Sequence, residues 1–212
     1  MLKLIRRIIP DYAHLPLTGC AVTLMLAYSL TKLIDIFPTV DIALGIDAMI
    51  AVRPAWVVVY ILSYIYWTIG YIAIARIGKK SCKRLTTADF IAKVICAAFF
   101  VLMPTEIERP VLTGGGFEWL LSMIYTLDTP DNLFPSMHCL FSWLVARQVM
   151  ESDSFGRMQK LCAVVFSVLV FASTLFTRQH YVVDIFGGMA VAEIAIFAAK
   201  MLEKYRYRGA EE

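Results

Sequence analysis

Charged residues are scarce in this sequence. Only 17% of its 212 residues are Asp, Glu, Lys or Arg, whereas 59% are hydrophobic, and the mean hydropathy is +0.69. This composition leaves too little polar surface for a water-soluble domain and predicts a membrane protein. The net charge of +3 arises from short basic clusters between apolar segments. Because such clusters do not form the basic stripe of a nucleic-acid-binding protein, we expect no nucleic-acid partner.

Patterns typical of metal sites and disulfide frameworks are also missing. The five cysteines, which are scattered and form no C-x-x-C pair, are Cys20, Cys82, Cys96, Cys139 and Cys162. We therefore expect buried thiols rather than disulfides or a structural zinc. No Walker pattern follows the glycine run at residues 114–116, which we interpret as a flexible turn. Carboxylates and histidines do not cluster at metal-ligand spacing, so we expect neither a metal nor another cofactor.

Six apolar segments approach or exceed the roughly 20 residues that a helix needs to cross a bilayer. They are residues 15–37, 55–77, 85–103, 133–150, 161–176 and 181–202. We predict a single all-α membrane domain over residues 1–212, a polytopic bundle of six transmembrane helices. Residues 1–14 begin with basic side chains and are predicted to lie on the membrane surface, and residues 104–132 form the longest polar connection. The fourth and fifth segments are short, so either could instead be a helix buried among the others.

Clustered Lys and Arg residues indicate the orientation of the bundle. With six crossings, the N-terminus, the loop 76–84, the loop 157–160 and the C-terminal tail lie on one face, and they hold most of the clustered basic residues. By the positive-inside rule this face, with both termini, is cytoplasmic, and residues 104–132 form an outer loop. Arg109, His138 and His180 were not used to choose the orientation, yet all three reach the extracytoplasmic face.

A histidine and an aspartate four residues apart, His180 and Asp184, would share one face of a helix. A carboxylate that binds one imidazole nitrogen fixes the tautomer and leaves the other nitrogen free as a nucleophile or base. Such a pair on its own is more often a polar contact at a helix end. The second histidine, His138, predicted at the same membrane face, favours catalysis.

The residues around His138 are suited to phosphate. Ser136 is a good N-cap for a helix that begins there, and a helix N-terminus offers free N–H groups and a positive dipole end to an anion. Arg109 and Arg178 could hold the same anion, and His138 could reach a leaving-group oxygen. Together these features predict phosphoryl transfer through histidine.

These residues resemble the three-part signature of the type 2 phosphatidic acid phosphatase superfamily. The matching motifs are Arg109-Pro110, Pro135-Ser136-x-His138 and Ser173-x-x-x-x-x-x-His180-x-x-x-Asp184. The resemblance covers about the last half of the chain and the six-span plan. It implies a metal-independent mechanism in which His180 attacks phosphorus to form a phosphohistidine and Asp184 orients His180.

The resemblance also implies roles for the residues of the second motif. His138 would protonate the leaving alcohol and then activate water, while Ser136 and the Met137 backbone would hold phosphate oxygens together with Arg109. The implied substrate is a lipid phosphate or diphosphate, phosphatidate-like or polyprenyl. The implied location is the cell membrane, with the active site on the extracytoplasmic face and the bilayer as a partner.

Three positions depart from the superfamily's pattern. Leu102 stands in the place of its first lysine, Met137 in the place of a glycine and Thr174 in the place of an arginine. Arg178, one helical turn beyond Thr174, could supply the missing guanidinium, or it could be an interfacial anchor that contacts only headgroups.

The loss of two basic residues leaves alternatives to a phosphatase. The pattern also resembles the sphingomyelin and inositol-phosphorylceramide synthases of the same superfamily, which transfer a phospho-headgroup to a lipid hydroxyl. A non-catalytic membrane transporter or scaffold is a third possibility. Its strongest signal is Glu193, about halfway along the sixth segment, although a hydrogen-bonded contact between helices is the simpler interpretation of one such carboxylate.

Overall fold

The computed structural model describes residues 8–31, 34 and 36–208. Half of the predicted surface segment 1–14 and three residues of the first predicted span therefore lie outside the described residues. Within the described part the chain is helical and contains no named strand, which confirms the all-α class. Its helices are η1 (Asp11–Ala13), α2 (His14–Thr31), η2 (Asp47–Met49), η3 (Pro54–Trp56), α3 (Val57–Ile77), α4 (Lys79–Leu102), α5 (Phe117–Leu127), α6 (Met137–Glu151), α7 (Arg157–Phe176) and α8 (Val182–Arg208).

Four helices of the described residues are long and apolar enough to cross a membrane. They are Pro54–Ile77, Lys79–Leu102, Arg157–Phe176 and Val182–Arg206. Large apolar side chains such as Ile69, Phe90 and Phe197 are exposed on them, as expected for surfaces that face lipid. Several apolar helices of this kind are typical of a membrane protein.

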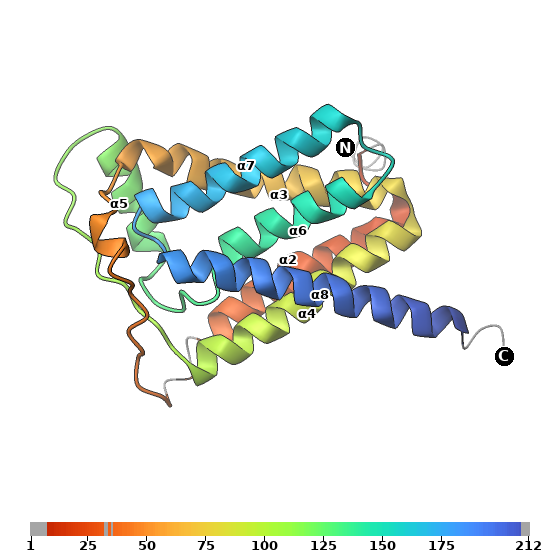
Figure 1. Cartoon of the computed structure of the whole chain (residues 1–212), viewed down its shortest axis with the longest axis horizontal. Helices are drawn as coiled ribbons and strands as arrows, with labels where there is room; N and C mark the ends of the chain where they lie inside the picture. Colours follow the sequence, from red (N-terminus) through yellow and green to blue (C-terminus); the bar gives the residue numbers. More distant parts are fainter. Residues whose placement is uncertain (1–7, 32–33, 35, 209–212) are drawn as a thin grey trace.

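Helix α6 is the central helix of the bundle. It packs against α3, α7 and α8, while α4 packs against α2, α3 and α8 (Figure 1). With 15 residues, α6 is about 22 Å long, shorter than the ~30 Å hydrocarbon core of a bilayer. Ten of its residues are buried. The fourth apolar segment thus forms a short helix that its neighbours largely enclose.

The starts of α6 and α8 lie at the same end of the bundle, next to α5 (Figure 1). Helix α5 was not predicted, because residues 104–132 were interpreted as a loop. Gly116, with a φ of 63°, precedes its first residue, so the glycine run does form a turn. Leu121 is fully buried, whereas Trp119 and Leu127 are exposed. One face of α5 therefore covers this end of the bundle.

The cysteines are free thiols, as expected. Cys162 is exposed, and the four buried cysteines are Cys20, Cys82, Cys96 and Cys139.

A buried ion pair connects three helices. Lys93 Nζ lies 2.6 Å from Asp89 Oδ2, and the two side chains are 4% and 2% exposed. Tyr71 of α3 donates to the other carboxylate oxygen at 2.7 Å. Lys93 also donates to the carbonyl of Cys20 and to the hydroxyl of Thr23, both on α2. These bonds satisfy both charges and fix α2, α3 and α4 relative to one another.

Replacing Lys93 by Met should lower the free energy of unfolding by about 3–5 kcal/mol, because Asp89 then remains as a buried, unpaired charge. The double variant Lys93→Met/Asp89→Leu should recover most of this loss. Unfolding of the purified variants in one detergent measures both effects.

Lys200→Met is the matched control, because its ion pair with Glu151 is half-exposed and should contribute at most ~1 kcal/mol. A double variant as unstable as Lys93→Met would show that the pair is not the source of the effect.

Candidate active site

A close backbone contact joins the starts of α6 and α8. The N–H of Ser136 donates to the carbonyl of Asp184 at 3.1 Å. A Cβ on Gly188 would lie 2.5 Å from the carbonyl oxygen of Ser136, so only glycine permits this approach. Ser136 caps α6, as predicted, by accepting from Cys139 N–H at 3.3 Å.

His180 and Asp184 form a hydrogen-bonded pair. His180 Nδ1 lies 3.2 Å from Asp184 Oδ2, and Asp184 is fully buried. His180 precedes α8 by two residues rather than lying on it, which differs from the helix-face arrangement expected from the sequence. The same Asp184 oxygen accepts from Tyr181 N–H at 2.8 Å, as an acidic residue in the first turn of a helix often does. A carboxylate that accepts Nδ1–H leaves His180 Nε2 with a free lone pair.

His138 lies opposite, with its ring centroid 6.2 Å from that of His180. Three aromatic rings of α3 surround it: Tyr60 stacks at 4.1 Å, Trp67 lies at 5.0 Å and Tyr64 contacts it edge-on at 5.5 Å. Its Nε2 atom is buried and has no hydrogen-bond partner among the described residues. The imidazole is thus held by its faces, while one nitrogen is available to a substrate.

Tyr60 connects His138 to an acidic residue. The phenol donates to Asp128 Oδ2 at 2.9 Å, and its oxygen lies 3.5 Å from His138 Nδ1. Because the phenol hydrogen is used by Asp128, the oxygen is left as an acceptor for Nδ1–H. This contact directs Nε2 to the open side, and the Asp128 carboxylate offsets part of the cost of burying a protonated imidazole.

Arg109 is fixed from several directions. Its guanidinium donates to the carbonyls of Tyr125 and Asp128 and to the side-chain oxygen of Gln179. It also lies 4.6 Å from the ring centroid of Tyr125, a cation–π contact. Burial raises the pKa of Tyr125 to about 12, so its phenol stays neutral and donates to the carbonyl of Thr177 at 2.7 Å.

A cavity of about 430 Å³ brings these groups together. His138, His180 and Arg109 line it, as do Asp128 and Gln179. Its apolar walls are formed by Leu24, Met25, Phe100, Ile124, Leu127, Leu133, Met137 and Phe141. A cavity with polar groups at one end and apolar walls suits a ligand with a charged head and a hydrocarbon chain.

Arg178 does not line this cavity. It has a φ of 52°, and its guanidinium donates to the carbonyl of Asp47 at 2.8 Å. It lines a neighbouring cavity of about 330 Å³, which also contacts Arg109 and Glu108.

The two positions at which this chain lacks a basic residue of the superfamily's pattern, Leu102 and Thr174, carry no charge into the cavity. Thr174 is fully buried, and its carbonyl accepts the N–H groups of Gln179 at 2.9 Å and His180 at 3.2 Å. It therefore supports the backbone before α8. Leu102 is 64% exposed and is not part of the cavity wall.

Sequence reasoning did not identify the residues that hold His138. Sequence analysis gave the aromatic residues of segment 55–77 no role, yet Tyr60, Tyr64 and Trp67 recur at helical spacing and could have been recognised as one face. Gln179 and Asp128 carried no such signal, because their roles depend on contacts with distant residues.

Among the described residues, no group of three or more His, Cys, Asp or Glu side chains could hold a metal ion. The candidate site thus consists of two histidines that face one cavity in an all-helical protein. The family model described as PAP2 superfamily matches residues 37–198, and the chain belongs to this superfamily. Its members are generally phosphatases and phosphoesterases. No curated protein and no solved structure matches the chain significantly.

Tyr60→Phe should lower kcat for phosphate-ester hydrolysis roughly tenfold with little change in KM, because His138 keeps its stacking partner but loses the acceptor for Nδ1–H. Asp128→Asn should act in the same direction. Both changes disfavour protonated His138, so the basic limb of the pH–rate profile should move to lower pH.

Tyr66→Phe is the matched control, since this α3 phenol bonds to Ala163 and Ser167 of α7 and does not contact His138. A pH profile that moves equally in Tyr66→Phe, or in none of the variants, would contradict a positioning role for Tyr60 and Asp128.

Proposed function

We propose that the protein is a metal-independent lipid phosphatase that hydrolyses a lipid phosphate or diphosphate through a phosphohistidine intermediate. One observation carries the proposal. His138 and His180 face a single cavity at a centroid distance of 6.2 Å, and Asp184 binds His180 from the side opposite its free nitrogen. This is the arrangement that a nucleophile, an orienting carboxylate and an acid–base group require.

In the first step His180 Nε2 attacks phosphorus, and the bond between phosphorus and the leaving oxygen breaks. Asp184 stabilises the positive charge that develops on His180 through the Nδ1–H bond. His138 gives the proton on its Nε2 to the leaving alcohol. In the second step His138 takes a proton from water, the resulting hydroxide attacks phosphorus, the P–N bond breaks, and inorganic phosphate leaves with His180 restored.

Charge on the phosphoryl oxygens is compensated by Arg109 and the N-terminus of α6. The N–H groups of Met137 and His138 have no acceptor among the described residues. Ser136 is fully buried and does not line the cavity, so it supports phosphate binding indirectly, by capping the helix whose N-terminus faces the anion. Fixed donors of this kind stabilise a transferring phosphoryl group without reorganisation.

The apolar walls of the cavity support a lipid as the substrate. We further propose that α2, α3, α4, α6, α7 and α8 form the six crossings of the cell membrane, with both termini in the cytoplasm. Basic side chains at the start of α4 and the end of α8 support this orientation. The catalytic cavity then opens at the extracytoplasmic face, and Arg178 lies in the neighbouring cavity that Arg109 also lines.

Headgroup transfer to a lipid hydroxyl is the second candidate. It is favoured by the charge of the cavity, where Arg109 is the one guanidinium among the described lining residues and Asp128 and Asp131 are also present. A phosphodiester, with one negative charge, needs less compensation than a dianionic monoester.

The sequence feature that favoured a transporter, a carboxylate within the sixth apolar segment, has a structural explanation. Glu193 of α8 accepts from Trp143 Nε1 at 2.8 Å and pairs with Arg147, both on α6. It is thus the interhelical contact that the sequence favoured, and no observation supports transport.

His180→Ala should abolish phosphate release from a panel of lipid phosphates and diphosphates, and His138→Ala should lower it by roughly 10²–10⁴-fold, the usual contribution of a general acid–base group. Release is measured with purified protein in detergent. His14→Ala is the control, because His14 is the third histidine of the chain and is absent from the cavity wall.

Full activity in either His180→Ala or His138→Ala would exclude the phosphohistidine mechanism. If the wild type releases no phosphate but moves a labelled headgroup to a lipid alcohol in a His180-dependent reaction, the second candidate is correct.

Chelation of metals with EDTA should leave the rate of phosphate release unchanged, because Arg109 and the α6 N-terminus supply the positive charge. A Mg²⁺-dependent phosphatase in the same assay controls for effective chelation. Inhibition that is reversed by Mg²⁺ or Zn²⁺ would refute this prediction.

A further inference from the structure

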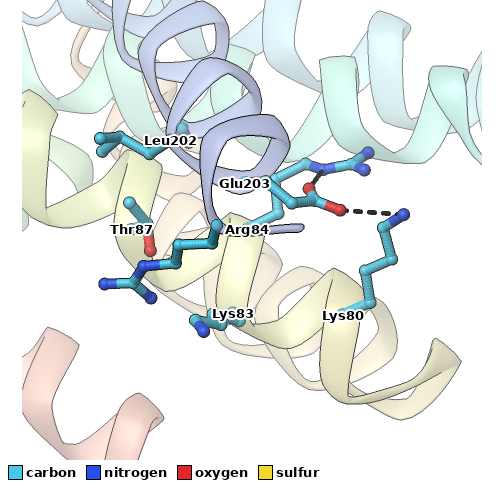
Figure 2. Close-up of a pocket in the computed structure, with 8 residues that line it drawn as sticks. Lys80, Lys83, Arg84, Thr87, Leu202 and Glu203 are labelled. Atoms are coloured by element: carbon cyan, nitrogen blue, oxygen red, sulfur yellow. Dashed lines mark hydrogen bonds and ion pairs between the residues drawn. The ribbon is translucent and has the colours of Figure 1, made fainter. Parts of the chain in front are cut away.

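A second polar cavity lies at the other end of the bundle, between the start of α4 and the end of α8. Its volume is about 290 Å³, and it is lined by Lys80, Lys83, Arg84, Thr87, Ala199, Leu202, Glu203 and Arg206 (Figure 2). From Asp184 in the catalytic site to Glu203, α8 rises about 28 Å, close to the thickness of the hydrocarbon core. The two cavities are therefore at opposite faces of the membrane.

Glu203 organises the basic side chains of this cavity. Its carboxylate oxygens lie 2.9 Å from Lys80 Nζ and 2.8 Å from Arg84 Nε, so a residue of α8 holds two residues of α4 in place (Figure 2). The Glu203 side chain is only 18% exposed. Four basic residues against one acidic residue leave the cavity with a net charge of +3.

Several donors of the cavity are unused. Among the described residues, no side-chain partner contacts Lys83 Nζ, the Arg206 guanidinium or the two terminal NH₂ groups of Arg84, which is engaged only through Nε. Lys83 and Arg206 are exposed and add positive charge, whereas Glu203 holds the partly shielded Arg84, and a guanidinium with both NH₂ groups available is suited to phosphate.

The position of the cavity indicates what carries the anion. It lies at the ends of two helices long enough to span a membrane, Lys79–Leu102 and Val182–Arg206, and therefore at the depth of lipid headgroups. Ala199 and Leu202 form an apolar wall beside the charges. We propose that this cavity binds the phosphate-bearing headgroup of an anionic membrane lipid, with the acyl chains along α4 and α8.

A competing explanation is that these basic residues only set the orientation of the bundle, because Lys and Arg are enriched at the cytoplasmic end of membrane proteins in general. A matched pair of variants separates the two explanations. Lys83→Gln/Arg206→Gln removes two positive charges from the cavity, whereas Arg157→Gln/Lys160→Gln removes two from the start of α7 at the same end, outside the cavity.

The experiment titrates phosphatidylglycerol into each purified protein in a neutral detergent and follows the rise in Tm, with phosphatidylcholine and inorganic phosphate as parallel ligands. Phosphatidylglycerol should stabilise the wild type and the Arg157→Gln/Lys160→Gln protein equally. Its apparent affinity for Lys83→Gln/Arg206→Gln should be about 25-fold weaker, taking about fivefold for each basic residue near an anionic headgroup. High salt should weaken the effect in the wild type.

Equal weakening in both variants, or no weakening in either, would overturn the proposal, as would equal stabilisation by phosphatidylcholine. A Lys83- and Arg206-dependent response to inorganic phosphate as large as that to phosphatidylglycerol would assign the cavity to soluble phosphate rather than lipid. Phosphate release by Lys83→Gln/Arg206→Gln should match the wild type, which keeps this test independent of the proposed catalysis.

Discussion

The close approach of α6 and α8 is the constraint on which the catalytic cavity depends. Ser136 and Asp184 share a backbone hydrogen bond, and Gly188 provides the space that a side chain would fill. Asp184 also accepts from Tyr181 N–H and from His180. One residue therefore joins the two helix starts, fixes the turn before α8 and orients the proposed nucleophile. A shift of α8 along α6 would disturb all three relations at once.

Polar contacts deeper in the bundle preserve that relation. Packing between helices in lipid has no hydrophobic driving force, so interhelical ion pairs and hydrogen bonds have a larger part in selecting one arrangement. Arg147 and Glu193 connect α6 to α8, and Glu203 connects α8 to Lys80 of α4. These contacts lie at successive levels along α8. They restrict both its rotation and its sliding, which sets the position of Asp184 at its start.

The parts that the sequence predicted correctly are those encoded within a few neighbouring residues. The helical class follows from long apolar segments, and the cap of α6 follows from Ser136. The pairing of His180 with Asp184 also followed from spacing, although the pair forms through the first turn of α8 and not along a helix face. The role of Asp128 could not be predicted, because it acts on His138 of α6 through Tyr60 of α3, two residues from separate helices.

Because Leu102 and Thr174 carry no positive charge, two candidate reactions have to be compared, hydrolysis and headgroup transfer. Both candidate reactions share the formation of a phosphohistidine and differ only in the acceptor that follows, water or a lipid hydroxyl. That acceptor has to lose its proton to His138 Nε2. Around His138 the wall is formed by Tyr64, Trp67 and Phe141, which are aromatic, so the approach along the bundle favours a lipid alcohol.

The approach from α5 is different, because Asp131 and Asn132 line the cavity there and can conduct water to the same nitrogen. Whether water or a lipid alcohol reacts then depends on which of the two approaches to His138 Nε2 is occupied when the first product leaves. A lipid alcohol that departs along the apolar wall vacates the position that a lipid acceptor would need, whereas water already has a polar path. Under the proposed mechanism, hydrolysis is therefore favoured unless a second lipid replaces the first faster than the phosphohistidine meets water.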